Sequence, residues 1–445
     1  MEEYHNQSRE IFAPCSRQLF FEPPSPAQQL YETLRWLRTG RDDCSEHGLE
    51  IVHLNGQAET LMEHFRHQGM TGLLGFNKSF IARRLTCKSR CSRTKLTETN
   101  TPSSLYGKSK VPLFRCIRCN ERYSARRATA LWGIRLCDED YFRVTKSLAE
   151  GNGIRTTSRI LDLDKDTVQR CALSAGEHCR FVESVLMHHL HLEECQLDEM
   201  WSFVFKKQGH LSAFEQLMDD IGDIWLHVAF EPRLKLFLAV VPAKRNLESI
   251  RKVTRTVHLK SDGHTPLFTG DEYSGNLDAL LWEYGQLARD DRQGLVGPPI
   301  RSSYMVPTSG LNFAVVNKTR ENGRIQSVKS EIVLGSKRKI KKILDDSPCS
   351  RNINISFVER SNLHQRLNNR RLTRKTLGFS KKLAMHEAQI WLCRGYYHYV
   401  RPHSSLKVRS DDKAHWTQRT PAMAAGVTNH VWSMKELLTF PNCYN

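Results

Sequence analysis

The sequence predicts a multidomain α/β protein in which small N-terminal modules precede a domain built on a mixed β-sheet flanked by helices. The chain has 445 residues, and at roughly 150 residues per domain this length favours about three domains. Apolar residues follow helical spacing over 138–180 and change to strand-like patterns from Cys195 onward. Strands that alternate with helices in this way are typical of an α/β domain.

These changes of pattern divide the chain into five segments. Residues 313–334 are expected to form a β-hairpin inserted in the fourth segment, around a turn at 321–324. The segments are an N-terminal extension of unknown role (1–80), a zinc-ribbon-like basic module (81–127), a helix-turn-helix domain (128–185), the mixed-sheet domain (190–408) and a C-terminal tail (409–445).

The charge balance points to a polyanionic partner. Lys and Arg number 66 against 48 Asp and Glu, which gives a net charge of +18. Residues 83–127 and 337–382 each carry a net charge of +11. Two such blocks with interleaved aromatic residues favour nucleic acid over a merely solvated surface. Candidate DNA contacts in the second block are Arg370, Arg371, Arg374 and Lys375.

Membrane insertion and secretion are not expected. The longest apolar run, 236–241, is far shorter than the ~18 residues that span a bilayer. The N-terminus lacks a basic region followed by an apolar region, so we expect a cytoplasmic protein. The thirteen cysteines are an odd number in a long chain, which favours reduced thiols or a metal site over a disulfide framework.

Two cysteine pairs have the spacing of a zinc ribbon. Cys87 and Cys91 are separated by three residues, Cys116 and Cys119 by two, and 24 residues lie between the pairs. Four thiolates suit tetrahedral Zn²⁺, and a small basic segment has little core of its own to stabilise it. The alternative is that these are ordinary free cysteines.

Residues 154–175 are typical of a helix-turn-helix. A short helix over 154–161 is followed by a turn, and Asp164 is a suitable N-cap for a helix over 165–175. The second helix presents Lys165, Gln169 and Arg170 for base recognition, and Arg155 and Arg159 on the first could contact phosphates. The alternative is an ordinary pair of packed helices.

The mixed sheet is predicted from several short segments. Three successive strands are expected first, and a short buried strand that leads into Asp271 follows a helix. Helices dominate from 357 to 399. The three strands are 195–204, 224–230 and 234–241, the helices 246–259 and 277–284, and the short strand 266–269.

Three carboxylates stand in positions that suit catalysis. Asp198 lies inside the first strand, Asp271 follows the fourth, and Glu359 begins a basic helix. Three acids of this kind can hold two Mg²⁺ (or Mn²⁺) ions for phosphoryl transfer. The alternative makes each acid a surface residue or salt-bridge partner. Competing acids are Glu199 beside Asp198, Glu272 beside Asp271, and Asp262.

Several segments resemble bacterial insertion-sequence transposases of the DDE class, specifically the insertion-element-one-like group. Residues 148–168 are similar to that family's helix-turn-helix, 197–204 to its first catalytic strand, and 356–363 with 372–382 to its glutamate helix and the sequence that follows. Residues 396–406 and 419–427 resemble its C-terminal signature. The resemblance covers roughly 87–440.

The resemblance implies an RNase H-like catalytic domain. Asp198, Asp271 and Glu359 match the family's acidic triad, and Arg366 matches the basic residue after the glutamate. Where the family reads Asp-Gly after the fourth strand, this chain has Asp271 followed by Glu272, so Asp262, which is followed by glycine, remains an alternative.

The implied activity is DNA transposition. The protein would bind the terminal inverted repeats of its element as double-stranded DNA, cleave a phosphodiester with Mg²⁺ and join the end to target DNA. Joining two ends implies a homodimer or higher assembly, in a bacterial, nucleoid-associated setting. The other interpretations are a DNA-binding regulator with a degraded site and a nuclease that cuts without joining.

Overall fold

The computed structural model describes residues 96–98, 111, 113–116, 122–289, 303–322, 324–409 and 415–440. The expected extension at 1–80 and three of the four predicted zinc ligands, Cys87, Cys91 and Cys119, lie outside these residues. The fourth, Cys116, ends the central strand of a three-stranded antiparallel sheet. Its strands are β1 (Leu96–Glu98), β2 (Leu113–Cys116) and β3 (Arg122–Ser124).

Three helices follow, as the pattern predicted: α5 (Asp138–Ala149), α6 (Ile154–Ile160) and α7 (Lys165–Leu186). The side chain of Asp164 accepts hydrogen bonds from the first backbone N–H groups of α7, which confirms the predicted N-cap. The predicted end of this helix at residue 175 is wrong, because α7 continues to Leu186.

The continuation of α7 is held by a second helix, α12 (Leu383–Gly395). A Cβ at Gly176 would lie only 2.2 Å from the carbonyl oxygen of Ala388, so the two helices approach more closely than a larger residue would permit. Val182 and Val185 beyond this point are also buried. The part of α7 beyond residue 175 is therefore packed on a segment that is distant in the sequence, and such packing stabilises a helix more than local propensity does.

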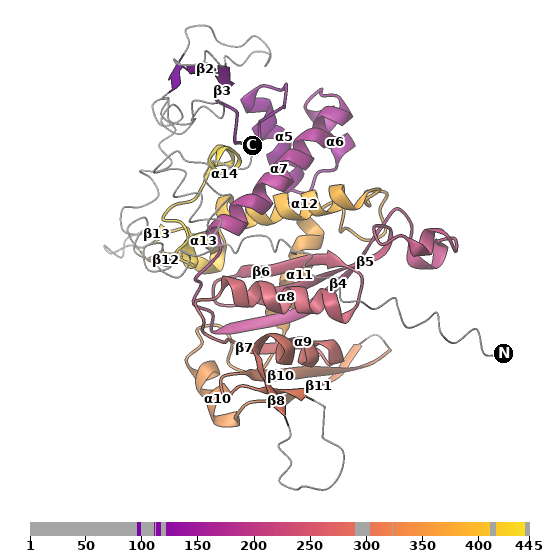
Figure 1. The fold of residues 1–445 in the computed structure, drawn as a ribbon, viewed down its shortest axis with the longest axis vertical. Coiled ribbons are helices and arrows are strands. Elements are labelled where there is room, and N and C mark those ends of the chain that lie inside the picture. The colour runs from indigo at the N-terminus through magenta and orange to yellow at the C-terminus, as the bar shows by residue number, and fades with distance from the viewer. Residues whose placement is uncertain are drawn as a thin grey trace, which may run out of the picture.

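A six-stranded mixed sheet forms the centre of the larger domain, in the order β11-β10-β7-β4-β5-β6 (Figure 1). β10, β7 and β4 run parallel, whereas β4, β5 and β6 form an antiparallel meander. The three predicted successive strands and the short fourth strand are confirmed. The bounds are β4 (Glu194–Val204), β5 (Gly222–Glu231), β6 (Leu236–Ala243), β7 (Leu267–Gly270), β10 (Asn312–Glu321) and β11 (Arg324–Leu334).

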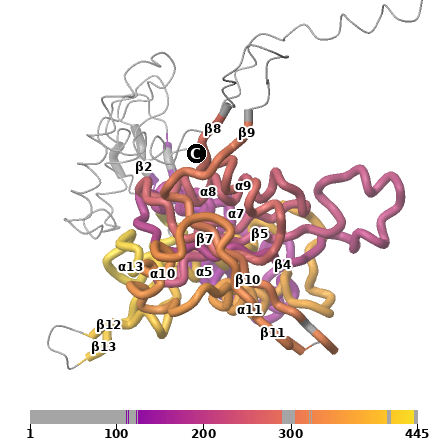
Figure 2. The backbone as a smooth tube through the Cα atoms, turned by 90° about the horizontal axis from the view of Figure 1, so that it is seen from below, coloured from indigo at the N-terminus to yellow at the C-terminus, as the bar shows by residue number. Residues whose placement is uncertain are grey.

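The expected hairpin is part of this sheet, because β10 is hydrogen-bonded in parallel to β7. Its first strand continues to Glu321, where the predicted turn begins. Two smaller two-stranded ribbons project from the body (Figure 2). They are β8 (Gly285–Arg289) with β9 (Ser303–Pro307), and β12 (Val408–Arg409) with β13 (Trp416–Thr417).

Helices cover both faces of the sheet. On one face, α8 (Leu247–Lys260) packs on β5 and β6, and α9 (Ser274–Tyr284) packs beside α8. On the other, α11 (Ser356–Asn368) packs on β4 and β5. The basic helix α10 (Lys337–Asp345) follows β11 and was not predicted. This arrangement is compatible with the expected RNase H-like fold.

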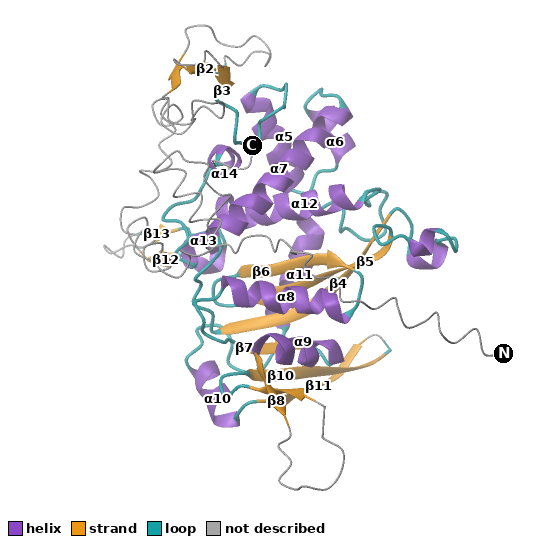
Figure 3. Ribbon diagram, in the orientation of Figure 1, coloured by secondary structure: helices purple, strands orange, loops and turns teal. Residues whose placement is uncertain are grey.

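The C-terminal residues are built into the helical layer, where α5, α7, α12 and α14 (Met434–Thr439) lie together (Figure 3). The indole of Trp432 is buried and stacks on Tyr399 at a ring distance of 4.9 Å. The carbonyl of Leu438 accepts a hydrogen bond from the backbone of Ala130. No helix in the described part of the chain is long and apolar enough to cross a membrane.

Candidate active site

Asp198 lies on β4 and faces α11. Residues two apart on a strand point to the same face, and Gln196, two residues earlier, accepts a 2.9 Å hydrogen bond from the backbone N–H of Val358. The Gln196 side chain also donates to the carbonyl of Asn354, just before α11. Asp198 itself accepts a 2.7 Å hydrogen bond from the Asn362 side chain on α11. Gln196 and Asp198 therefore fix the start of α11 against the sheet.

Asp271 directly follows β7, the parallel neighbour of β4. Gln196 and Thr269 are the last paired residues of these two strands, and both side chains donate to the carbonyl of Asn354. Asp198 and Asp271 each lie two residues further along. Asp271 accepts a 3.2 Å hydrogen bond from the backbone of Tyr273. The parallel register therefore brings together two acids that are 73 residues apart.

The two aspartates and Glu359 share one electrostatic environment. Burial raises the pKa of Asp198 from 3.8 to about 6, and the negative charges of Asp271 and Glu359 also raise it. The pKa of Asp271 is raised as well, first by burial and then by the charge of Glu199. Like charges held together in a partly buried place favour a proton or a bound cation.

Glu359 comes from the first turn of α11, immediately after the anchored Val358. Its carboxylate pairs with the ammonium of Lys318 on β10 at 2.5 Å. The Lys318 side chain is 18% exposed and that of Glu359 is 39% exposed. Glu359 is thus near Asp198 but paired with a lysine that the sequence did not single out.

Arg366 makes two hydrogen bonds to backbone carbonyls. It donates to Trp201 on β4 at 2.8 Å and to Leu372 beyond α11 at 3.0 Å. Burial lowers the pKa of Arg366 to about 10; the charge of Arg374 lowers it further, and that of Asp198 opposes the shift. The contacts that the structure gives Arg366 therefore tie the end of α11 to the sheet.

The competing acids differ in their surroundings. Glu199 lies close enough to Asp271 for its charge to raise the pKa of Asp271. Glu199 itself pairs with Arg245 at 3.0 Å, and the Arg245 guanidinium lies over the rings of Trp225 and Tyr273. The carboxylate of Asp262 accepts a 2.8 Å hydrogen bond from His191, before the starts of β7 and β4. This is the strand end opposite to Asp271. Glu272 is exposed.

The donor atoms suit a hard cation. Besides the carboxylates, the side-chain oxygen of Asn362 is buried and has no hydrogen-bond partner, and Mg²⁺ prefers oxygen donors of this kind. Within the described ranges, no three or more His, Cys, Asp or Glu side chains are gathered as a set that could hold a metal ion. The third carboxylate, that of Glu359, is paired with Lys318.

The candidate DNA contacts of the helix-turn-helix are all exposed. They comprise Arg155 and Arg159 on α6 and Lys165, Gln169 and Arg170 on α7. In the second basic block, Arg370, Arg374 and Lys375 are exposed, whereas Arg371 lies inward and donates to Ser380 at 3.4 Å. Burial lowers the pKa of Arg371. Arg371 is therefore less available to a phosphate than its neighbours are.

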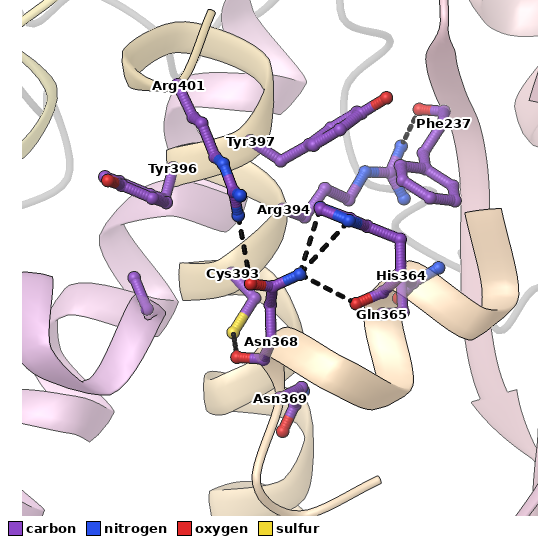
Figure 4. Close-up of a pocket in the computed structure, with 11 residues that line it drawn as sticks. Phe237, His364, Gln365, Asn368, Asn369, Cys393, Arg394, Tyr396, Tyr397 and Arg401 are labelled. Atoms are coloured by element: carbon purple, nitrogen blue, oxygen red, sulfur yellow. Dashed lines mark hydrogen bonds between the residues drawn. The ribbon is translucent and has the colours of Figure 1, made fainter. Parts of the chain in front are cut away.

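Sequence reasoning missed a pocket on the far part of α11 (Figure 4). Arg401 donates to the Asn368 side chain at 2.9 Å, and Tyr396 donates to Glu150, which follows α5, at 2.5 Å. These contacts join the helix-turn-helix region to α11. Some of the residues that line this pocket belong to the C-terminal signature at 396–406. That motif does not reveal which residues lie next to it in the folded protein.

A buried charge cluster was missed for the same reason. Glu183 on α7 pairs with Lys260, Arg394 and His398, from two other parts of the chain. Burial alone would raise the pKa of Glu183, but the charges of Arg394 and Lys260 lower it to about 2. The cluster stabilises the junction of the helical layer with the sheet.

Comparison with known proteins gives little to set beside this geometry. No family model matches the chain, and no curated protein matches it. Among solved structures it is similar to the Mos1 transposase paired-end complex with left transposon end, at 12% identity and a TM-score of 0.14. That likeness covers 31% of this chain and 54% of the Mos1 chain, so the match spans about half of that protein. At this TM-score it supports no conclusion about fold or function.

Proposed function

We propose that this chain is a DNA transposase that cleaves and joins DNA through Asp198, Asp271 and Glu359. The observation that carries the proposal is the parallel register of β4 and β7, which sets Asp198 and Asp271 side by side on the face covered by α11. The raised pKa of Asp198, caused by burial and by both other acids, fits a site that uses a cation.

Mg²⁺ or Mn²⁺ would be held by Asp198, Asp271 and Glu359. When bound, the metal activates the attacking oxygen and stabilises the leaving oxygen of a phosphodiester. The residues of this chain supply rigid positions for these ligands. Asn362 orients Asp198, the backbone of Tyr273 orients Asp271, and Gln196 fixes the turn of α11 that carries Glu359.

DNA would be bound at separate surfaces. In this proposal the exposed residues of α6 and α7 recognise the terminal inverted repeats, and exposed Arg370, Arg374 and Lys375 bind phosphates beyond α11. Cys87, Cys91, Cys116 and Cys119 would hold Zn²⁺ in the preceding basic module. Pairing of two ends requires a dimer or higher assembly.

The test is an assay of purified protein with labelled end DNA and a target plasmid, with Mg²⁺ or with EDTA. We expect Mg²⁺-dependent strand cleavage and then joining of the 3′ end to the target. Asp198→Asn should remove both steps, while Asp278→Asn, a change on α9, serves as the matched control. Cleavage without joining would indicate a nuclease instead, and specific binding without cleavage would indicate a DNA-binding regulator.

A further inference from the structure

We propose that Lys318 is a positioning residue that competes with metal for the carboxylate of Glu359. This inference rests on the proposed function, because it assumes that Glu359 is a metal ligand. The Lys318 ammonium lies 2.5 Å from the Glu359 carboxylate. A divalent cation that uses Glu359 must therefore displace Lys318 from it.

The sheet holds Lys318 in this place. Val316, two residues earlier on β10, is buried in the same apolar cluster as Val358. Because residues two apart on a strand share a face, Lys318 emerges next to Glu359, which follows Val358 on α11. Both partners thus come from rigid elements that are packed on one another, so the ion pair is part of the folded site.

The pairing also explains the incomplete set of ligands. Asp198 and Asp271 are oriented by Asn362 and by the backbone of Tyr273, whereas Glu359 is paired with a cation from β10. A lysine ammonium is a compact charge that neutralises the carboxylate without bringing it to the two aspartates. Lys318 thereby reduces the repulsion among the three carboxylates when no metal is bound, and it weakens the binding of the first metal ion.

The experiment measures Mn²⁺ binding to the full-length, zinc-loaded protein without DNA, by calorimetry and by electron paramagnetic resonance of free Mn²⁺. Lys318→Met should bind Mn²⁺ about fivefold more tightly than the wild type, the scale expected when a partly exposed ion pair no longer competes. Lys318→Arg should restore near-wild-type affinity.

Lys329→Met is the matched control, because it removes the same charge from the neighbouring strand, where Lys329 pairs with Asn317 in the register. It should leave the Mn²⁺ affinity unchanged. An equal gain in Lys329→Met would show a general charge effect and would overturn the role of Lys318. Thermal unfolding of each variant shows whether it is folded.

Asp198→Asn separates failure of this inference from failure of the proposed function. If Asp198→Asn weakens Mn²⁺ binding while Lys318→Met binds as the wild type does or more weakly, Lys318 does not compete, and the metal site stands. If Asp198→Asn binds Mn²⁺ as the wild type does, the acidic site holds no metal, and both proposals are overturned.

Discussion

Asn362 on α11 donates a 2.7 Å hydrogen bond to the carboxylate of Asp198 on β4. The bond spans 164 residues of sequence and joins two side chains, one on the helix that carries Glu359 and one on the strand that carries Asp198. The side-chain oxygen of Asn362 is also buried and has no hydrogen-bond partner.

Asn362→Ala should therefore slow cleavage while DNA binding is retained. A hydrogen bond to a charged group contributes about 1.5–3 kcal/mol, which corresponds to a roughly 10- to 100-fold slower reaction if the bond positions Asp198 in the transition state. The measurement is the single-turnover cleavage rate of end DNA. Leu363→Ala, at the exposed next residue of α11, is the control, and an equal loss there would contradict the assigned role.

Asp198 should make the metal-free protein less stable as the pH rises. Its folded-state pKa of about 6 lies above its ordinary value of 3.8, so the folded chain binds the proton more tightly than the unfolded chain does. The stabilisation is complete below about pH 4 and is lost as the pH rises through 6. Asp198→Asn should raise the free energy of unfolding by about 3 kcal/mol at pH 7.5.

That gain should shrink as the pH falls to 4 and should vanish only well below pH 3.8, where Asp198 is protonated in both states. Scanning calorimetry in EDTA at the two pH values measures it. If Asp198→Asn is less stable than the wild type at pH 7.5, the folded state favours the charged form of Asp198. That result would contradict the effect of burial on Asp198 described above.

Asp271→Asn should remove cleavage, whereas Asp262→Asn should not. Asp271 lies beside Asp198 at the end of a buried strand, while Asp262 is bound to His191 before the opposite end of that strand. A metal ligand must be fixed next to its fellow ligands by rigid structure. Parallel cleavage assays in Mg²⁺ decide between them, and an inactive Asp262→Asn beside an active Asp271→Asn would relocate the site.

Changes at Lys165, Gln169 and Arg170 should abolish recognition of specific ends while non-specific binding persists. Each lost base contact should cost about 1–3 kcal/mol, whereas a lost phosphate contact weakens binding to all sequences alike. Competition binding with end DNA and random DNA at one salt concentration measures both. Arg180→Ala, nearly three turns beyond Arg170 on α7, is the control. Equal losses on both DNAs would make α7 a phosphate-binding helix only.

Glu359→Gln should separate binding from chemistry. If Glu359 only forms an ion pair with Lys318, replacing it should leave the cleavage rate unchanged. If Glu359 is a metal ligand, its loss should slow cleavage by more than roughly 100-fold. That is the upper cost typical of losing a residue that only hydrogen-bonds to a metal ligand. DNA affinity should hold or rise, because one negative charge is removed. Affinity and cleavage rate are measured on the same preparations, and unchanged cleavage would remove Glu359 from the site.

Local pattern was sufficient for much of the fold. Strand-like apolar patterns predicted β4, β5 and β6, a short apolar run predicted β7, and Asp164 predicted the start of α7. Each of these depends on residues within a few positions of one another, so the sequence shows them directly. The three acids were selected in the same way, from their places at strands and at a helix start.

By itself, then, the sequence determined the order of β4, β5, β6 and β7, the cap of α7, the two basic blocks and the choice of Asp198, Asp271 and Glu359 as candidates. Only the tertiary structure showed the close approach of α7 to Ala388 and the pairing of Glu359 with Lys318 across 41 residues. It also decided that Arg366 binds backbone carbonyls and that Trp432 belongs to the core. These features depend on which distant surfaces pack together, and no local periodicity encodes the partner that a side chain meets after the chain has folded.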